Sequence, residues 1–249
     1  MKKLFSVLTA LFLCTTSAFA ASFLDSRGRV EIIMYHRICS DEGCRNPYCI
    51  TPAEFENDLK FFKSRGFESI FTSSLADSDL RGRRVVVITF DDGYKSDIEF
   101  AVPLLEKYGF CATFYVFGAA IGTPGYLSED DLRCMSAKSC AEIGNHTYAL
   151  HEYAPSTLNL LYSNPAMLDK IITDFSRNSS YLESVTGKAV MTAAYPNGEY
   201  SAEADRRLKL SGVKTTFSTE PYSFSKVLPD KPIGRKTRVS GAEIENLMK

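Results

Sequence analysis

Short apolar runs alternate with amphipathic stretches along most of this chain. Most of the runs are rich in β-branched and aromatic residues, and they lie at 30–35, 67–71, 85–90, 111–117, 141–146, 190–195 and 213–217. The run 85–90 lacks the polar alternation of a strand with one wet face, which indicates a strand buried on both sides, as in a parallel sheet. The stretches between the runs repeat apolar residues at helical spacing. We therefore predict one parallel α/β domain, and a barrel rather than an open sheet.

Residues that typically begin helices divide the chain in the same way. Thr51, with Glu54 three positions later, predicts a capping box at the start of a helix, and Ser128 predicts a second capped start. Helical spacing also covers 96–108. The tail from residue 226 has no readable pattern, so its place in the fold stays open.

The first 20 residues have a composition of their own. Two lysines precede the apolar run 4–13, and small residues end the segment at Ala18 and Ala20. This pattern is typical of a secretory signal peptide cleaved near Ala20, and the run is too short to span a bilayer as a mature helix. We expect residues 21–249 to form the mature domain, secreted or periplasmic, without a transmembrane anchor.

Charge limits the kind of partner. The chain has 249 residues, with 29 lysines and arginines, 30 aspartates and glutamates, and a formal net charge of -1. Because the two signs are interspersed, the sequence offers no electrostatic case for binding nucleic acid or an anionic membrane. We expect a neutral or small partner.

Six cysteines remain when Cys14 is set aside with the signal peptide. They are Cys39, Cys44, Cys49, Cys111, Cys134 and Cys140. An exported chain can oxidise them, and we predict one bridge between Cys134 and Cys140 and a second within the first trio. A zinc knuckle is the alternative for that trio, although it contains no Cys-x-x-Cys. Cys111 lies in an apolar run and is predicted to be a buried strand residue.

Two adjacent acids end the apolar run 85–90. Asp91 and Asp92 would point to opposite faces of a regular strand, so they can serve one site only if the strand breaks there, and Gly93 gives the chain that freedom. The carboxyl ends of parallel strands are where α/β folds hold their ligands. A solvated acidic turn or a helix cap is the plainer alternative.

The three histidines, His36, His146 and His151, each lie at a predicted strand end or in the loop after one. On a helix, a spacing of five would hold His146 and His151 roughly 140° apart, so they can converge only from a loop. Two imidazoles and one carboxylate form an open site that suits zinc or another divalent transition metal. A second carboxylate could then act as a base, which indicates metal-assisted hydrolysis.

These residues carry a resemblance to a known family. The segment Thr89-Phe90-Asp91-Asp92-Gly93 resembles the first motif of the polysaccharide deacetylases, carbohydrate esterase family four, and residues 144–151 resemble the second. A five-residue histidine spacing is that of the subgroup that deacetylates poly-β-1,6-N-acetylglucosamine, the biofilm adhesin. The segment around His36 is also similar to that subgroup, in which a circular permutation moves the histidine of the last motif to the amino end.

The resemblance covers about residues 30 to 240 and implies a distorted (β/α)7 barrel. It also implies Asp91 as the general base and His36 as the general acid. Asp92, His146 and His151 would be the ligands of a divalent metal, zinc in the first place, with cobalt, nickel or iron as alternatives. The substrate would be an N-acetylated polysaccharide.

One motif departs from the family pattern. The third motif usually carries an arginine before Pro-Tyr-Gly, an arginine that orients the base, but here it reads Ala-Ala-Tyr-Pro-Asn-Gly. Arg235 or Arg238 could substitute from the tail, and an equally strong reading makes both of them surface charges. Tyr195 and Asn197 are expected to line the cleft with Arg235. Tyr148 could stack on a sugar or fill the core.

We therefore expect a metal-dependent hydrolase that removes N-acetyl groups from N-acetylglucosamine units, with chitin-type or peptidoglycan-type glycans as alternative substrates. The missing arginine motivates a second hypothesis, an inert glycan-binding relative, because loss of an orienting partner can remove rate without removing binding. Non-haem iron oxygenases also use two histidines and a carboxylate. They build that site on an antiparallel β scaffold, whereas the alternation of strands and helices in this sequence predicts a parallel α/β fold.

Overall fold

The structure is a computed structural model that describes residues 29–40, 45–220 and 231–249. The expected signal peptide lies outside these ranges. No helix within them is long and apolar enough to cross a membrane.

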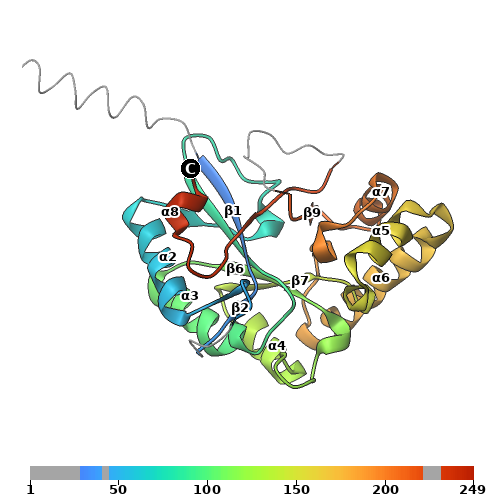
Figure 1. Ribbon diagram of the computed structural model, residues 1–249, viewed down its shortest axis with the longest axis horizontal. Coiled ribbons are helices and arrows are strands. Elements are labelled where there is room, and N and C mark those ends of the chain that lie inside the picture. Colours follow the sequence, from blue (N-terminus) through green and yellow to red (C-terminus); the bar gives the residue numbers. More distant parts are fainter. Residues whose placement is uncertain (1–28, 41–44, 221–230) are drawn as a thin grey trace, which may run out of the picture.

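A curled parallel sheet forms the centre of the domain (Figure 1). Its strands follow the spatial order β10-β1-β5-β6-β7-β8-β9, and β4 (Glu68–Ser69) pairs with the amino half of β5. The bounds are β1 (Arg29–Tyr35), β5 (Arg84–Phe90), β6 (Ala112–Val116), β7 (Ala141–Asn145), β8 (Thr192–Ala194), β9 (Thr215–Phe217) and β10 (Lys236–Thr237). All of these pairings are parallel, so their carboxyl ends share one edge.

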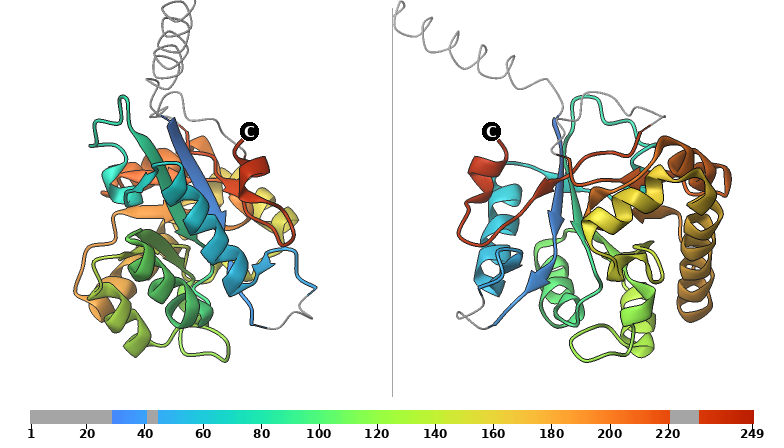
Figure 2. Two further views of the ribbon diagram at one scale, coloured as in Figure 1. Left: turned by 90° about the vertical axis from the view of Figure 1, so that its left-hand side faces the viewer. Right: turned by 45° about the vertical axis from the view of Figure 1, so that its right-hand side comes forward.

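The two edges of the sheet meet through the segment 233–237. On one side Phe217 bridges Ile233, and Ser218 N–H donates to the Ile233 carbonyl at 2.9 Å. On the other side β10 pairs with β1, with Ile33 opposite Lys236. Both views of Figure 2 show this red segment beside β1. The expected distorted barrel is thereby confirmed, with a seam made of few hydrogen bonds.

Helices pack around the outside of the sheet, with α2 and α3 on one side and α5, α6 and α7 on the other (Figure 1). Their bounds are α2 (Pro52–Ser64), α3 (Val102–Tyr108), α4 (Glu129–Ser136), α5 (Pro155–Ser163), α6 (Leu168–Thr186), α7 (Ala202–Leu210) and α8 (Ile244–Leu247). A π-helical turn, Asp97–Ala101, runs into α3. Short 3-10 turns occupy Thr72–Ser74, Gly118–Ala120, Leu150–Glu152, Pro165–Met167 and Pro196–Gly198.

The predicted helix starts at Thr51 and Ser128 are confirmed, each with a complete capping box. Thr51 N–H donates to the Glu54 carboxylate at 2.8 Å, and Glu54 N–H donates back to the Thr51 hydroxyl at 3.1 Å. A cap of this kind is worth about 1 kcal/mol of helix stability. Thr51 directly follows the short strand β3 (Cys49–Ile50), so this cap fixes the point at which the chain passes from β3 into α2.

Aromatic rings fill the core between α2 and the strands that lead to the site. Phe90 lies between Tyr35 and Phe114, with ring centroids 5.1 Å away on each side, and Phe55 of α2 meets it edge-on. Burying one such ring fully is worth about 1.5–3 kcal/mol. Tyr35 and Phe90 are the last residues of β1 and β5, so this packing holds the positions of the residues that follow them.

The cysteine prediction was half right. Cys39 and Cys49 form a disulfide, with Cα atoms 5.9 Å apart, as expected for one local bridge in the first trio. That bond removes both thiols from any zinc knuckle. The predicted bridge between Cys134 and Cys140 is wrong, because both side chains are free. Cys134 is exposed on α4, whereas Cys140 is buried just before β7.

Candidate active site

Strand ends deliver the predicted residues to one edge of the sheet. Asp91 and Asp92 follow β5, His36 follows β1, and His146 follows β7. His151 comes from the 3-10 turn Leu150–Glu152 beyond β7. The order β1-β5-β6-β7 makes these ends near neighbours, which explains how residues far apart in the sequence meet.

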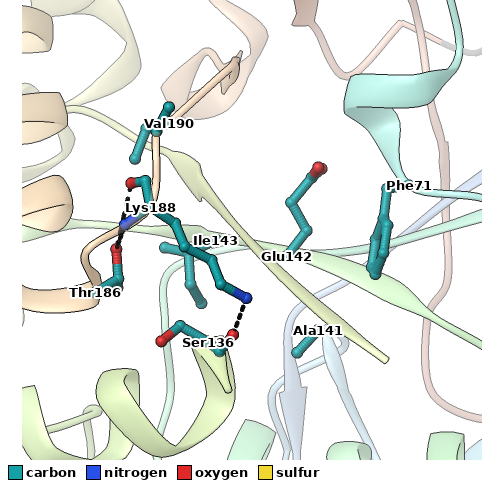
Figure 3. Close-up of a pocket in the computed structure, with 9 residues that line it drawn as sticks. Phe71, Ser136, Ala141, Glu142, Ile143, Thr186, Lys188 and Val190 are labelled. Carbon is teal, nitrogen blue, oxygen red and sulfur yellow. Dashed lines mark hydrogen bonds between the residues drawn. The ribbon is translucent and has the colours of Figure 1, made fainter. Parts of the chain in front are cut away.

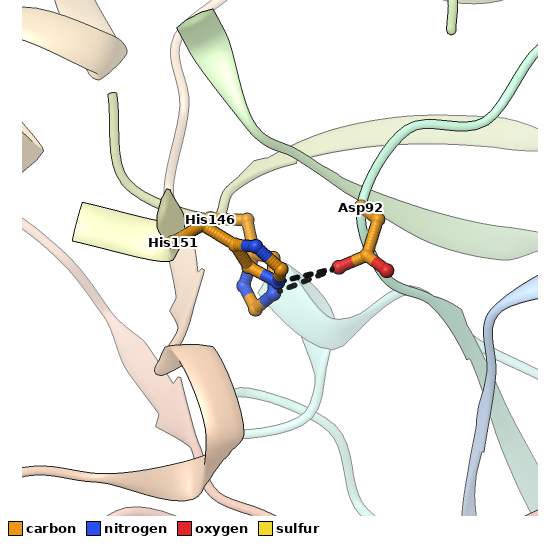
Figure 4. A group of neighbouring side chains, drawn as sticks. All are labelled: Asp92, His146 and His151. Atoms are coloured by element: carbon orange, nitrogen blue, oxygen red, sulfur yellow. Dashed lines mark ion pairs between the residues drawn. The ribbon is translucent and has the colours of Figure 1, made fainter. Parts of the chain in front are cut away.

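The carboxylate of Asp92 faces both imidazoles (Figure 4). Its Oδ1 lies 2.9 Å from His151 Nε2 and 3.4 Å from His146 Nε2. The strand breaks here as expected, because Asp92 has φ 78° and Gly93 has φ 75°. Two successive left-handed residues turn Asp92 back beside Asp91, so that both carboxylates serve one site. A non-glycine residue at positive φ is uncommon and needs surrounding structure to hold it.

A hydrogen bond fixes the tautomer of His146. Its Nδ1 lies 2.8 Å from the Ala194 carbonyl of β8, and a carbonyl can only accept, so Nδ1 carries the hydrogen. The lone pair is therefore on Nε2, the atom that faces Asp92. An imidazole oriented in this way is prepared to bind a metal ion.

The loop between the histidines is built by local hydrogen bonds. Thr147 has φ 73°, and its N–H donates to the Asn145 side chain at 2.8 Å. Tyr148 N–H then donates to Asp174 of α6 at 2.7 Å. These bonds reverse the chain after β7 and bring His151 back toward Asp92, which is how a five-residue spacing converges without a helix.

Asp91 is held by a buried arginine. The Nη1 and Nη2 atoms of Arg235 lie 2.6 and 2.7 Å from the two carboxylate oxygens of Asp91. Arg235 is 0% exposed and Asp91 is 2% exposed, so water does not screen this pair. Burial alone would raise the pKa of Asp91, but the charges of Arg235 and the nearby imidazoles outweigh it and hold that pKa below its ordinary value. The carboxylate is therefore ionised.

The two tail arginines have different partners. Arg238 donates from Nε to Asp58 of α2 at 2.7 Å, on the outer side of β1, and takes no part in the site. Both arginines are buried, so the surface-charge reading of them is wrong. The expectation that Arg235 contacts substrate is also wrong, because its buried guanidinium donates its hydrogen bonds to Asp91, Thr89 and a backbone carbonyl.

His36 is half-buried and directly follows β1, near enough to Asp91, Asp92 and His146 to feel their charges. Burial lowers its pKa below the ordinary histidine value, although the charges of Asp91 and Asp92 oppose that shift. Its Nδ1 atom is buried and has no hydrogen-bond partner among the described residues. The ring instead contacts Tyr48, with centroids 4.9 Å apart.

Comparison with known proteins decides the family. Residues 79–216 match the sequence profile of the family described as "Polysaccharide deacetylase". The chain belongs to this family. The resemblance inferred from the motifs is confirmed, and the oxygenase alternative falls with it.

Relatives and solved structures agree with that assignment. A poly-β-1,6-N-acetyl-D-glucosamine N-deacetylase of Staphylococcus aureus strain N315 is 27% identical over 215 residues, which are 81% of this chain and 71% of that protein. The structure of IcaB from Ammonifex degensii superposes with a TM-score of 0.73 at 21% identity, covering 88% of this chain and 94% of that one. Streptococcus pyogenes deacetylase PplD, in complex with acetate, gives 0.75 at 22% identity, covering 90% and 99%.

The expectation that Tyr195 lines the cleft of this deacetylase is wrong. Tyr195 is fully buried, and its hydroxyl donates to Asp205 at 3.0 Å, so its side chain is part of the core. Asn197 is exposed in the turn after β8, with φ 55°, and remains a candidate. Tyr148 is half-buried, and the Arg177 guanidinium lies 3.4 Å from its ring centroid, so that ring face is already covered.

Sequence reasoning missed Tyr48 and Asp97. Tyr48 had no signal beyond its place among the cysteines. Asp97 is fully buried, and neither carboxylate oxygen finds a hydrogen-bond partner within the described ranges. Burial, together with the charges of Asp92 and Asp91, raises the pKa of Asp97 well above its ordinary value.

A cavity of about 170 Å³ lies at the amino end of β7, away from the triad that follows the carboxyl end (Figure 3). Its lining residues are Phe71, Ser136, Ala141, Glu142, Ile143, Thr186, Lys188, Ala189 and Val190. Lys188 donates to the Ser136 carbonyl, and Glu142 accepts from Thr113 at 2.7 Å. Its charged groups are therefore engaged with protein partners, and it has no histidine. The chemistry lies at the other end of the strands.

Proposed function

We propose that this polysaccharide deacetylase is an exported, metal-dependent enzyme that removes N-acetyl groups from N-acetylglucosamine units of a polysaccharide. The observation that carries the proposal is the convergence of Asp92, His146 and His151 beside a second carboxylate, Asp91, that a buried arginine holds ionised.

The donor set fits a divalent transition metal. One ligand atom from each of Asp92, His146 and His151 lies within 4.8 Å of the others, and the tautomer of His146 leaves Nε2 free to bind. Two imidazoles and one carboxylate suit zinc first, and also cobalt, nickel or iron. An ion held there would act as a Lewis acid on the acetamide carbonyl and on water.

The protein's own groups supply the proton transfers. Asp91 is the general base that accepts a proton from the attacking water, and Arg235 keeps it ionised and oriented through both oxygens. His36 follows β1, the strand next to β5, and lies close enough to Asp91 and Asp92 for their charges to act on it. We assign it the donation of a proton to the departing amine nitrogen, without which the C–N bond would release an amide anion.

The substrate class follows from the histidine arrangement and the relatives. The five-residue spacing of His146 and His151, together with His36 at the amino end, favours poly-β-1,6-N-acetylglucosamine, the substrate in the name of the Staphylococcus aureus relative. Chitin-type and peptidoglycan-type glycans are the alternatives. The Cys39–Cys49 disulfide supports export, because such bonds persist in oxidising compartments.

The test is acetate release from β-1,6-linked and β-1,4-linked N-acetylglucosamine oligomers after chelation and reloading with zinc, cobalt or nickel. We expect release from the β-1,6 oligomers, and a loss of about 10²-fold to 10⁴-fold in Asp91→Asn. No release with any metal, at a protein concentration that gives a folded spectrum, would exclude the proposal.

An inert glycan-binding relative was motivated by the arginine missing from the third motif. Arg235 now supplies a guanidinium to Asp91 from the tail, so that motivation is gone. Binding of the β-1,6 oligomers without any turnover would favour the inert glycan-binding alternative again.

A further inference from the structure

Tyr48 is an exposed aromatic residue beside His36. Its side chain is 46% exposed, although most large apolar residues in the described part of the chain are buried. The ring contacts the His36 imidazole with centroids 4.9 Å apart and an interplanar angle of 37°. An exposed ring in contact with an active-site imidazole is a candidate for a role in the reaction.

A tight turn presents this ring. Cys49 N–H donates to the Asn46 carbonyl at 3.0 Å, which closes a four-residue turn, and Pro47 occupies the second position, where its fixed φ is favoured. Tyr48 N–H also donates to the Asn46 side chain at 3.0 Å, as in an Asx turn. The backbone of Tyr48 is therefore tied at its own residue and at the next one.

Three further contacts anchor the turn to the barrel. The Cys39–Cys49 disulfide joins it to the residue that directly follows β2 (Arg37–Ile38), three positions after His36. Cys39 N–H donates to the Ile50 carbonyl at 2.8 Å, which extends the pairing of β2 with β3. Ser240 N–H donates to the Pro47 carbonyl at 2.8 Å. These contacts tie the turn to the segment that directly follows His36.

His36 needs such support more than His146 does. The Nδ1 atom of His146 is fixed by the Ala194 carbonyl, whereas Nδ1 of His36 is buried without a hydrogen-bond partner in the described structure. An imidazole with no such bond can rotate about its side-chain bonds. The ring of Tyr48, in contact with the imidazole, restricts this rotation.

We propose that Tyr48 is a positioning residue for His36 and that the Cys39–Cys49 disulfide holds Tyr48 in place. This inference rests on the proposed function, in which His36 donates the proton to the leaving nitrogen. Tyr48 acts through its ring and not through its hydroxyl.

The first test uses acetate release from β-1,6-linked N-acetylglucosamine oligomers. Tyr48→Ala should lower kcat about 10-fold to 100-fold, the scale for a misplaced catalytic group, with KM within about twofold and zinc affinity unchanged. Tyr48→Phe should restore the rate. Leu210→Ala removes another exposed large side chain, far away on α7, and should change nothing.

A double-mutant cycle separates positioning from mere packing. In the His36→Ala background, Tyr48→Ala should cost no further rate, because the group it positions is absent. The Cys39→Ser/Cys49→Ser variant should lose rate as Tyr48→Ala does, and adding Tyr48→Ala to it should cost no more. Additive losses in either cycle, or a Tyr48→Ala variant as fast as wild type, would overturn the proposal.

A readout without turnover keeps the inference testable on its own. The chain has three histidines, so their Cε1–H signals can be resolved by NMR and assigned with His→Ala variants. Tyr48→Ala should shift the His36 signal and increase the mobility of its ring, while His146 stays unchanged. Unchanged His36 mobility would overturn the inference. Absence of acetate release from wild type would overturn only the proposed function.

Discussion

Replacing Arg235 by Met is the sharpest test of how the base is held. The substitution keeps most of the side-chain volume but removes the charge, and so leaves the Asp91 carboxylate buried without its two charge-assisted hydrogen bonds. Removing one partner of a buried ion pair costs about 3–5 kcal/mol. For a domain of this size that predicts a fall in Tm of roughly 6 to 20 °C.

The same change should alter catalysis in a defined direction. In the proposed mechanism Asp91 is the base and acts only when ionised, so activity should be present above its pKa and lost as the pH falls through it. Arg235 helps to hold that pKa below its ordinary value of 3.8. Without Arg235, the acid limb of the kcat profile should move to higher pH, and kcat at its plateau should fall about 10-fold to 100-fold.

Arg238→Met is the matched control. Arg238 is equally buried and also meets a carboxylate with two nitrogens, at 2.7 and 3.2 Å from Asp58, but outside the site. It should lose similar stability, measured by urea unfolding, while kcat per folded molecule and the pH profile stay as in wild type.

A double-mutant cycle completes the test. Arg235→Met combined with Asp91→Asn removes both charges, so the double variant should be more stable than Arg235→Met alone. If the free energy of unfolding of Arg235→Met is within about 1 kcal/mol of the wild-type value, the buried pair contributes less stability than we expect. If its acid limb stays in place, Arg235 does not tune the base.

Three further outcomes are expected. His36→Ala should bind zinc as wild type does in calorimetry yet lose about 10²-fold to 10⁴-fold in rate, whereas His146→Ala should weaken zinc binding itself; loss of zinc in the first variant would contradict the role of His36. Chelation followed by zinc addition should raise Tm with zinc concentration, as binding to the native state alone requires, and a flat response would argue against the triad as the site. Gly144→Ala should cost about 1–3 kcal/mol in urea unfolding, because its Cβ would lie 2.5 Å from the buried ring of Tyr115, and a smaller cost would mean that this ring can shift.

The motif residues could be predicted because their signals are local. A buried apolar run followed by Asp91 and Asp92 indicates a parallel strand that ends at a site, and the same reasoning places His36 and His146 at strand ends. The capping box at Thr51 is local as well. In each case the residues that decide the structure lie within a few positions of one another.

Arg235 could not be chosen from Arg238 in the same way. Both follow an unpatterned stretch, and β10 has only two residues, so neither periodicity nor propensity separates them. The pairing of β10 with β1, some 200 positions earlier, decides which arginine reaches the site. It places Arg235 inside the barrel and Arg238 against α2. Tyr195 was misjudged for a related reason, since Asp205, the partner of its hydroxyl, lies one helix later.

The seam at 233–237 has a consequence for a chain that emerges amino end first. β1 and β5 can pair, and enclose Asp91, well before residue 235 has left the ribosome. Until then the carboxylate lacks its guanidinium partner, and a buried charge without that partner opposes closure of the barrel by several kcal/mol. The arginine that pairs with Asp91 is therefore also needed for the barrel to close. A fragment cut short before it would stay open to proteolysis rather than persist as a half-assembled enzyme.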